Sequence, residues 1–222
     1  MTDKKVSGAG YTFVEKVRAP FVTLVTPQKV GKKGQEKGDP VYSLTVLLPA
    51  ASPDLKNLKA KMAEVAREMW PGRALSELKF PISNGDQEAE KATAAGKDGA
   101  FFKGMAVFRA RSGADKPPAL AVLEGIKIVE LAGQQREIVG KQKFYNGCYV
   151  VPSVWLVPYK SSKEGGIGEF SGIKAYVGSV LWAGDGERIG GASAAETFRA
   201  YAGAVSDEDP TAGGSSDDEI PF

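Results

Sequence analysis

Basic and aromatic side chains alternate along two segments that we expect to be β-strands. In residues 101–111, one face of the predicted strand would carry Lys103, Arg109 and Arg111. In residues 143–151, Lys143, Tyr145 and Tyr149 would share a face. A single-stranded nucleic acid needs cations along its phosphates and flat rings that stack on unpaired bases. Because strands are rich in aromatic residues in any case, buried packing is the alternative for each tyrosine taken alone.

Other segments extend this basic and aromatic pattern more weakly. A glycine-rich basic loop after the second predicted strand carries Lys32 and Lys33, which would add phosphate contacts. Lys174, Tyr176 and Trp182 share a face of the last predicted strand. Trp155 is expected to lie in the core.

Most enzyme chemistry is excluded by composition. The chain has no histidine, and Cys148 is its only cysteine. Ser-His-Asp and Cys-His nucleophiles, histidine-ligated metals and an intrachain disulfide are therefore ruled out. The sequence also lacks a P-loop and the glycine spacing of a dinucleotide-binding turn. We expect no catalytic residue, metal or cofactor, and the unpaired thiol fits a reducing cytoplasm.

One string resembles an enzyme motif. Asp54, followed later by Glu77 and Lys79, matches the pattern of many metal-dependent nucleases. In such sites the acids hold magnesium and the lysine supports the attacking water. Here Asp54 begins a predicted helix, so a chance match is the favoured interpretation.

The charges of the chain are distributed unevenly. Among 222 residues there are 29 basic and 27 acidic ones. Arg199 is the last basic residue, and six acids follow it: Asp207, Glu208, Asp209, Asp217, Asp218 and Glu219. Without these six, 29 basic residues face 21 acidic ones, so the body carries +8 and the tail −6. This separation suggests a surface that binds polyanions and a tail that competes for it.

The tail, residues 206–222, has too few apolar residues to fold, so we expect it to be disordered. A solubilising end is the simplest explanation of such a tail. It leaves Ile220 and Phe222 unexplained, since solubility does not need apolar residues there. Residues 1–205 are expected to form the folded domain.

The body is predicted to be mainly β. Strands are expected at 13–17, 21–25, 42–48, 101–111, 120–123, 126–131, 143–151, 154–159 and 173–182. A helix opens at Ser52-Pro53-Asp54 and carries an apolar stripe with helical spacing, namely Leu55, Leu58, Met62, Val65 and Met69. Residues 88–99 should form a loop or a short exposed helix. No secretory segment or membrane span is expected. Many strands with few helices favour an antiparallel barrel.

The final hexamer, Asp217-Asp218-Glu219-Ile220-Pro221-Phe222, is similar to the acidic tip on which bacterial single-stranded DNA-binding proteins recruit partners. The body instead resembles a phage family of single-stranded DNA-binding proteins, related to the T7-type replication protein and built on an elaborated OB-fold. The resemblance spans about residues 13–191. It is carried by residues 42–49, Asn84-Gly85-Asp86, residues 144–151 with Tyr159, and residues 172–180 with 184–187.

The combined prediction is a mainly β, OB-fold-type antiparallel β-barrel with an inserted helix and a disordered acidic C-terminal tail. It would bind single-stranded DNA without sequence preference, in phage DNA replication, recombination or repair, within the bacterial host cytoplasm. The predicted phosphate contacts are Lys32, Lys33, Lys103, Arg109, Arg111 and Lys143, and the predicted stacking residues are Tyr145 and Tyr149. Host or phage replication and repair proteins would dock on Asp217, Asp218, Glu219, Ile220, Pro221 and Phe222. Two alternatives stay open: a magnesium-dependent nuclease, and an adaptor that only presents the tail.

Overall fold

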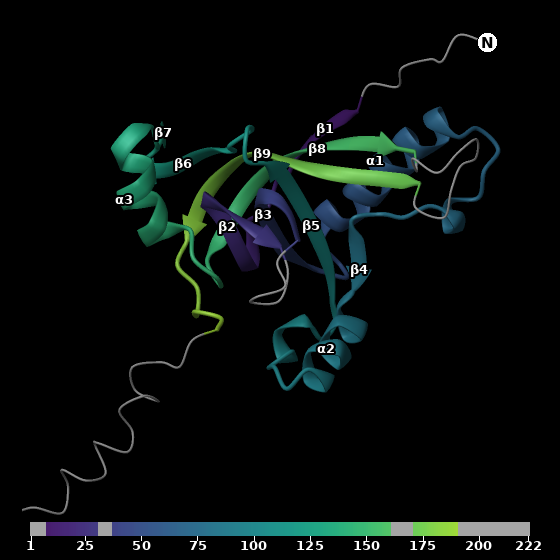
Figure 1. Cartoon of the computed structure of the whole chain (residues 1–222), viewed down its shortest axis with the longest axis horizontal. Helices are drawn as coiled ribbons and strands as arrows, with labels where there is room; N and C mark the ends of the chain where they lie inside the picture. The colour runs from purple at the N-terminus through teal and green to yellow at the C-terminus, as the bar shows by residue number, and fades with distance from the viewer. Residues whose placement is uncertain (1–7, 31–36, 161–170, 191–222) are drawn as a thin grey trace, which may run out of the picture. The chain divides into compact units, whose positions relative to one another are not determined.

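The computed structural model of the chain describes residues 8–30, 37–160 and 171–190. Its strands are β1 Ala9–Thr12, β2 Val17–Val30, β3 Lys37–Pro49, β4 Ile82–Asn84, β5 Met105–Gly113, β6 Ala119–Glu124, β7 Lys127–Glu130, β8 Tyr149–Tyr159 and β9 Gly172–Gly184 (Figure 1). Its helices are α1 Pro53–Met69, α2 Gly85–Ala94 and α3 Gly133–Lys143, with short 3-10 turns at Leu75–Glu77 and Ala100–Phe102. The predicted tail and the predicted domain boundary after residue 205 lie outside these residues.

The strands form one curled sheet, in the order β4-β5-β3-β2-β8-β9-β6-β7, with β1 added on β8. β6 pairs with β9 in parallel, while the other named strand pairs are antiparallel. The prediction of a mainly β protein with an inserted helix is confirmed. The sheet is mixed and not closed, however, where an antiparallel barrel was expected. Five long strands, β5-β3-β2-β8-β9, make up its central part, as in a partly open five-stranded barrel.

The two ends of this central part, β5 and β9, approach each other without forming a ladder. The segment before β4 fills the gap at one end. Lys79 bridges to Gly172 of β9, and the Arg109 backbone N–H donates to the carbonyl of Pro81 at 2.9 Å. At the other end the Ser112 hydroxyl donates to the carbonyl of Val177 at 2.7 Å. At one end of the gap, residues 79–81 therefore take the place of a direct β5–β9 ladder.

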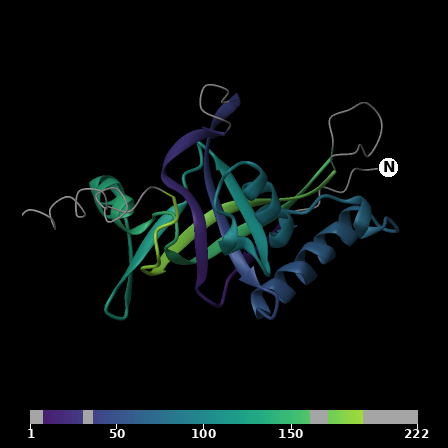
Figure 2. The same cartoon turned by 90° about the horizontal axis from the view of Figure 1, so that it is seen from below.

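Helix α1 packs against β1, β8 and β9 (Figure 2). Four residues of its apolar stripe are buried in the core and the fifth, Met69, is partly buried, as the helical spacing predicts. Asp54, in the first turn, is also fully buried. Its carboxylate accepts hydrogen bonds from the Tyr11 hydroxyl at 2.6 Å and from the backbone N–H groups of Val14 and Glu15 at 3.1 and 3.0 Å. Asp54 thus ties the start of α1 to the segment between β1 and β2.

Two strand predictions are wrong in ways that affect the candidate site. Residues 143–151 are not one strand, because Lys143 ends α3, a turn follows, and β8 begins only at Tyr149. Residues 100–102 form a 3-10 turn, so Lys103 precedes β5 and is not part of it. β2, in contrast, continues past Pro20, where the pairing with β3 shifts register between Arg18 and Phe21. This bulge accommodates a proline that cannot donate to a ladder.

Candidate nucleic-acid interface

One side of the β8-β2-β3-β5 sheet carries cationic, aromatic and hydroxyl side chains in rows, together with Leu47 and Val107, which are buried in a small apolar cluster with Ala89 and Phe102. Directly opposed residues on antiparallel strands project from the same side of a sheet. Three such rows make up what we call the sheet face: Tyr149, Arg18, Leu47 and Val107; Phe21, Thr45 and Arg109; and Thr23, Ser43 and Arg111. The alternate residues of β3, including Leu44, Val46 and Leu48, fill the core on the other side. Because successive side chains of β3 point to opposite sides of the sheet, one set of them lies in the core and the other set lies on the sheet face.

Arg109 is held firmly on the sheet face. Its guanidinium donates to the Ser83 hydroxyl at 2.7 Å and to a carboxylate oxygen of Glu88, on α2, at 2.6 Å. Burial of Glu88 acts to raise the pKa of its carboxyl group, but the charge and hydrogen bond of Arg109 outweigh it and lower that pKa. Glu88 is therefore ionised at neutral pH and offsets much of the Arg109 charge.

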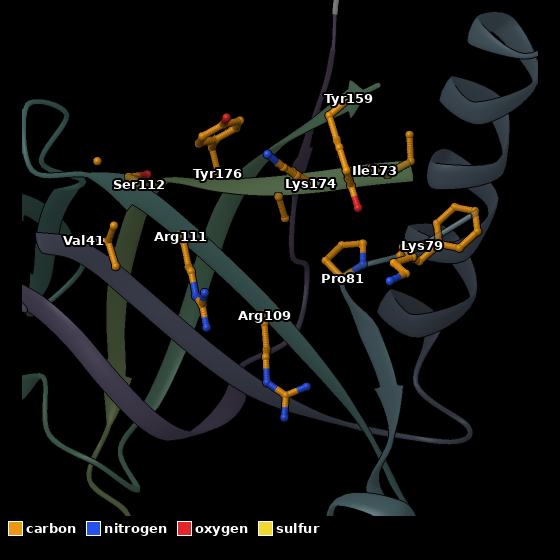
Figure 3. Close-up of a pocket in the computed structure, with 13 residues that line it drawn as sticks. Val41, Lys79, Pro81, Arg109, Arg111, Ser112, Tyr159, Ile173, Lys174 and Tyr176 are labelled. Atoms are coloured by element: carbon orange, nitrogen blue, oxygen red, sulfur yellow. The ribbon is translucent and has the colours of Figure 1, made fainter. Parts of the chain in front are cut away.

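Arg111 has different surroundings. Its side chain is exposed and makes no hydrogen bond or ion pair with any residue that the structure describes. It lines a pocket of about 530 Å³ between β5 and β9, which we call the β5–β9 pocket, together with Lys174, Tyr159 and Tyr176 (Figure 3). The ammonium of Lys174 lies 4.5 Å from the ring centroid of Tyr159. Arginine and lysine thus enter this pocket from both of its walls, where an anion would be attracted.

A second pocket, of about 560 Å³, lies at the opposite end of the sheet face. Lys16, Arg18, Phe101 and Tyr149 are among its lining residues, and the Lys16 ammonium lies 5.5 Å from the Tyr149 ring centroid. Phe21 borders this region with 44% of its surface exposed. Its ring centroid lies 6.1 Å from that of Phe101, and the two rings pack edge to face, which restricts the exposed Phe21 ring. Aromatic rings therefore accompany the cations at this end too.

The structure brings three of the predicted site residues together, because Arg109, Arg111 and Tyr149 all lie on the sheet face. Lys103 is exposed in the turn before β5. Lys143 lies at the end of α3, with its ammonium 4.1 Å from the ring centroid of Trp182. Lys32 and Lys33 lie outside the described residues, as do the six predicted docking residues of the tail.

Tyr145 lies in the turn between α3 and β8, not on a strand. Its hydroxyl donates to a carboxylate oxygen of Asp185 at 2.9 Å and accepts from the backbone N–H of Gly186 at 3.0 Å. Burial, followed by the Asp185 carboxylate, raises the pKa of Tyr145. The guanidinium of Arg188 lies 4.1 Å from its ring centroid. These contacts hold the turn that contains Tyr145 against the end of β9. Base stacking at Tyr145 remains a prediction.

Sequence reasoning missed Arg18 and Phe21 as site residues. Both lie on β2, and Pro20 between them led to the prediction of two separate strands. The alternation of Phe21 and Thr23 was a signal that one side of β2 could be exposed. Only the pairing register, however, places these residues beside Arg109 and Arg111.

The residues of the nuclease-like string have other partners. Asp54 is occupied by the hydrogen bonds described above, and the Glu77 carboxylate pairs with the Arg73 guanidinium at 2.9 Å. Within the part of the chain that the structure describes, no three histidine, cysteine or acidic side chains are grouped as metal ligands would be. Burial raises the pKa of the Cys148 thiol to about 11, which keeps it protonated and poorly reactive. Among the described helices, none has the length and apolar character needed to span a membrane.

Comparison with known proteins identifies relatives. A sequence model of the family "Enterobacter phage Enc34, ssDNA-binding protein" matches residues 12–209. The solved single-stranded DNA-binding protein of bacteriophage Enc34, in complex with ssDNA, is 25% identical over 84% of this chain and 96% of its own, with a TM-score of 0.57. A C-terminal truncation of the Enc34 protein is 24% identical over 82% of this chain and 88% of its own, with a TM-score of 0.55.

A more distant match extends the likeness in fold. The ssDNA-binding protein gp2.5 of bacteriophage T7 is 16% identical over 79% of this chain and 91% of its own, with a TM-score of 0.51. Curated proteins gave no significant match by sequence. Because the family model spans most of its length, the chain belongs to the family of the Enterobacter phage Enc34 ssDNA-binding protein.

Proposed function

We propose that this protein binds single-stranded DNA without sequence preference through the sheet face. It would act in phage DNA replication, recombination or repair, within the cytoplasm of a bacterial host. The observation that carries the proposal is the set of three opposed rows, in which Arg18, Arg109 and Arg111 accompany Phe21 and Tyr149. Membership of an ssDNA-binding family supports the same conclusion.

The cations and the aromatic rings of the sheet face have different roles in this proposal. Arg111 would contact phosphates directly. Arg18 would do so in competition with Glu187, whose carboxylate lies 3.7 Å from its guanidinium, and Arg109 in competition with Glu88. The exposed ring of Phe21 and the partly exposed ring of Tyr149 would stack on bases. Because every base has a π-face, such stacking is tolerant of sequence.

The position of the sheet face within the fold also supports this function. OB-folds bind oligonucleotides on the face of their second and third strands and on two loops beside it. If β2 is counted as the first strand of the barrel, its neighbours β3 and β5 occupy the positions of the second and third strands. Lys32 and Lys33, which lie between β2 and β3, are therefore also proposed to contact phosphates.

A second part of the proposal concerns the tail. Six acids within residues 207–219 are tethered to the domain that they would inhibit, so their effective concentration near a basic face is high. They would compete with DNA for the cations of the sheet face. The Ile220-Pro221-Phe222 tip would dock replication or repair proteins, with its apolar residues in a pocket and the preceding acids on a basic rim.

Fluorescence anisotropy of a labelled 20-nucleotide oligothymidine tests the DNA-binding function directly. We expect anisotropy to rise on addition of the protein, with and without magnesium, and the oligonucleotide to stay intact on a denaturing gel. A labelled duplex of equal length should bind more weakly, since its bases cannot stack on the rings. No rise in anisotropy would overturn the proposal, and cleavage only with magnesium would restore the nuclease alternative.

A further inference from the structure

A second pair of exposed aromatic residues lies outside the sheet face. Trp155 on β8 and Tyr176 on β9 are directly opposed in the ladder, so they project from the same side. Trp155 has 50% of its surface exposed and Tyr176 has 41%. The expectation that Trp155 lies in the core is therefore wrong. A half-exposed tryptophan beside a half-exposed tyrosine leaves a large ring surface in water, which is typical of a binding site.

The indole of Trp155 is held against the backbone of β1. Gly10 is opposite Trp155 in the β1–β8 ladder. A Cβ atom at Gly10 would lie 2.9 Å from Cζ3 of the indole, and one at Gly8 would lie 2.7 Å from its Nε1. Both distances are closer than a Cβ contact allows, so the two glycines permit this approach. The ring is thereby fixed in place while half of the residue remains accessible.

Positive charge lies next to this aromatic pair. Lys174 is exposed on β9, two residues from Tyr176 and on the same side of the strand. Lys174 and Tyr176 line the β5–β9 pocket together with Arg111 of the sheet face (Figure 3). The pocket therefore connects the aromatic pair to the sheet face through cationic side chains.

We propose that Trp155 and Tyr176 form a second base-stacking site, which takes up nucleotides that leave the sheet face past Arg111. This inference rests on the proposed binding of ssDNA by the sheet face and extends it to a longer path. The ligand is a segment of single strand, with one or two bases stacked on the rings and a phosphate near Lys174. The ring held by Gly8 and Gly10 is ordered before DNA arrives, which lowers the entropic cost of stacking.

Tryptophan fluorescence gives a readout specific to this site. The chain has three tryptophans, of which Trp70 is buried and Trp182 is partly buried beneath the ammonium of Lys143. We expect a 20-nucleotide oligothymidine to quench the emission of the wild type and of a Trp182→Phe control. In Trp155→Phe most of this quenching should be lost. Full quenching in Trp155→Phe, or none in a wild type whose anisotropy shows binding, would overturn the inference but not the proposed function.

Affinity provides a second test of the same site. Stacking of one base contributes about 1–3 kcal/mol, which corresponds to a 5- to 150-fold change in affinity. Trp155→Ala and Tyr176→Ala should each weaken binding of the 20-mer within this range and melt close to the wild-type temperature. Ile126→Ala is the control, because Ile126 is 98% exposed in the turn between β6 and β7 and lines neither pocket. If both alanine variants bind as tightly as this control, the second site does not exist. A wild type that does not bind the 20-mer at all would instead overturn the proposed function.

Discussion

Arg109 and Arg111 lie two residues apart on the same side of β5 but have opposite surroundings. Arg109 is paired with Glu88 and Ser83, whereas Arg111 has no partner among the described residues. A phosphate can approach Arg111 directly, but at Arg109 it must compete with a carboxylate. The two arginines should therefore contribute differently to DNA binding, although the sequence pattern alone makes them equivalent.

Replacing Arg111 with alanine should reduce the salt dependence of binding. For single strands, the slope of log affinity against log salt is about −0.7 per neutralised phosphate. Arg111→Ala should flatten the slope by up to about 0.7 and leave the melting temperature unchanged, because the side chain is exposed. Lys127→Ala, which removes an exposed cation from β7, is the matched control and should keep the wild-type slope. Equal slopes in both variants would show that DNA does not contact this part of β5.

Replacing Glu88 with glutamine should strengthen DNA binding. The substitution keeps the size of the side chain but removes the charge that offsets Arg109. We expect tighter binding at low salt and a slope steeper by up to about 0.7, because Arg109 becomes available on the sheet face. Glu64→Gln is the control, since Glu64 is paired with Lys61 on the surface of α1. Unchanged or weaker binding in Glu88→Gln would contradict the role given to this ion pair.

Some elements of this fold are predictable from local sequence, whereas others depend on long-range pairing. Helix α1 is predictable because its apolar spacing and its Ser-Pro-Asp start are local features. The continuation of β2 past Pro20 is not predictable from local sequence, because it depends on a bulge in the pairing with β3. Helix α3 is also missed, since its sequence is polar and only one of its residues is buried. Arg109, Arg111 and Tyr149 are recognisable by residue type, but their neighbours Arg18 and Phe21 depend on register, a long-range property.

The contact between Lys79, in the segment before β4, and β9 can be tested by replacing two glycines of β9 with alanine. At Gly172 a Cβ would lie 2.0 Å from the carbonyl oxygen of Lys79, whereas at Gly178 it would lie 3.4 Å from its nearest neighbour. Gly172→Ala should therefore destabilise the protein by about 1–3 kcal/mol, as overpacking does. Gly178→Ala should have little effect. Thermal unfolding measures both, and equal melting temperatures would show that the segment is not held tightly against β9.

At the scale of the whole molecule, the proposed competition between tail and DNA predicts the effect of a truncation. Deleting residues 206–222 should tighten binding to ssDNA, most strongly at low salt, since the competition is electrostatic and is screened as ionic strength rises. Phe222→Ala should keep DNA affinity close to wild type, because it removes no charge, while it should abolish docking to a replication partner. Anisotropy at several salt concentrations measures the first effect. Equal affinity of truncated and full-length protein at low salt would contradict the competition.

The location of the DNA is the central claim, and photocrosslinking tests it most directly. An oligothymidine that carries 5-iodouracil is bound to the full chain and irradiated, and the crosslinked peptides are identified by mass spectrometry. We predict crosslinks at Phe21 and Tyr149 of the sheet face, where an exposed and a partly exposed ring would stack on bases. Crosslinks confined to the β6–β7 hairpin or to α3, with none on the sheet face, would contradict the account.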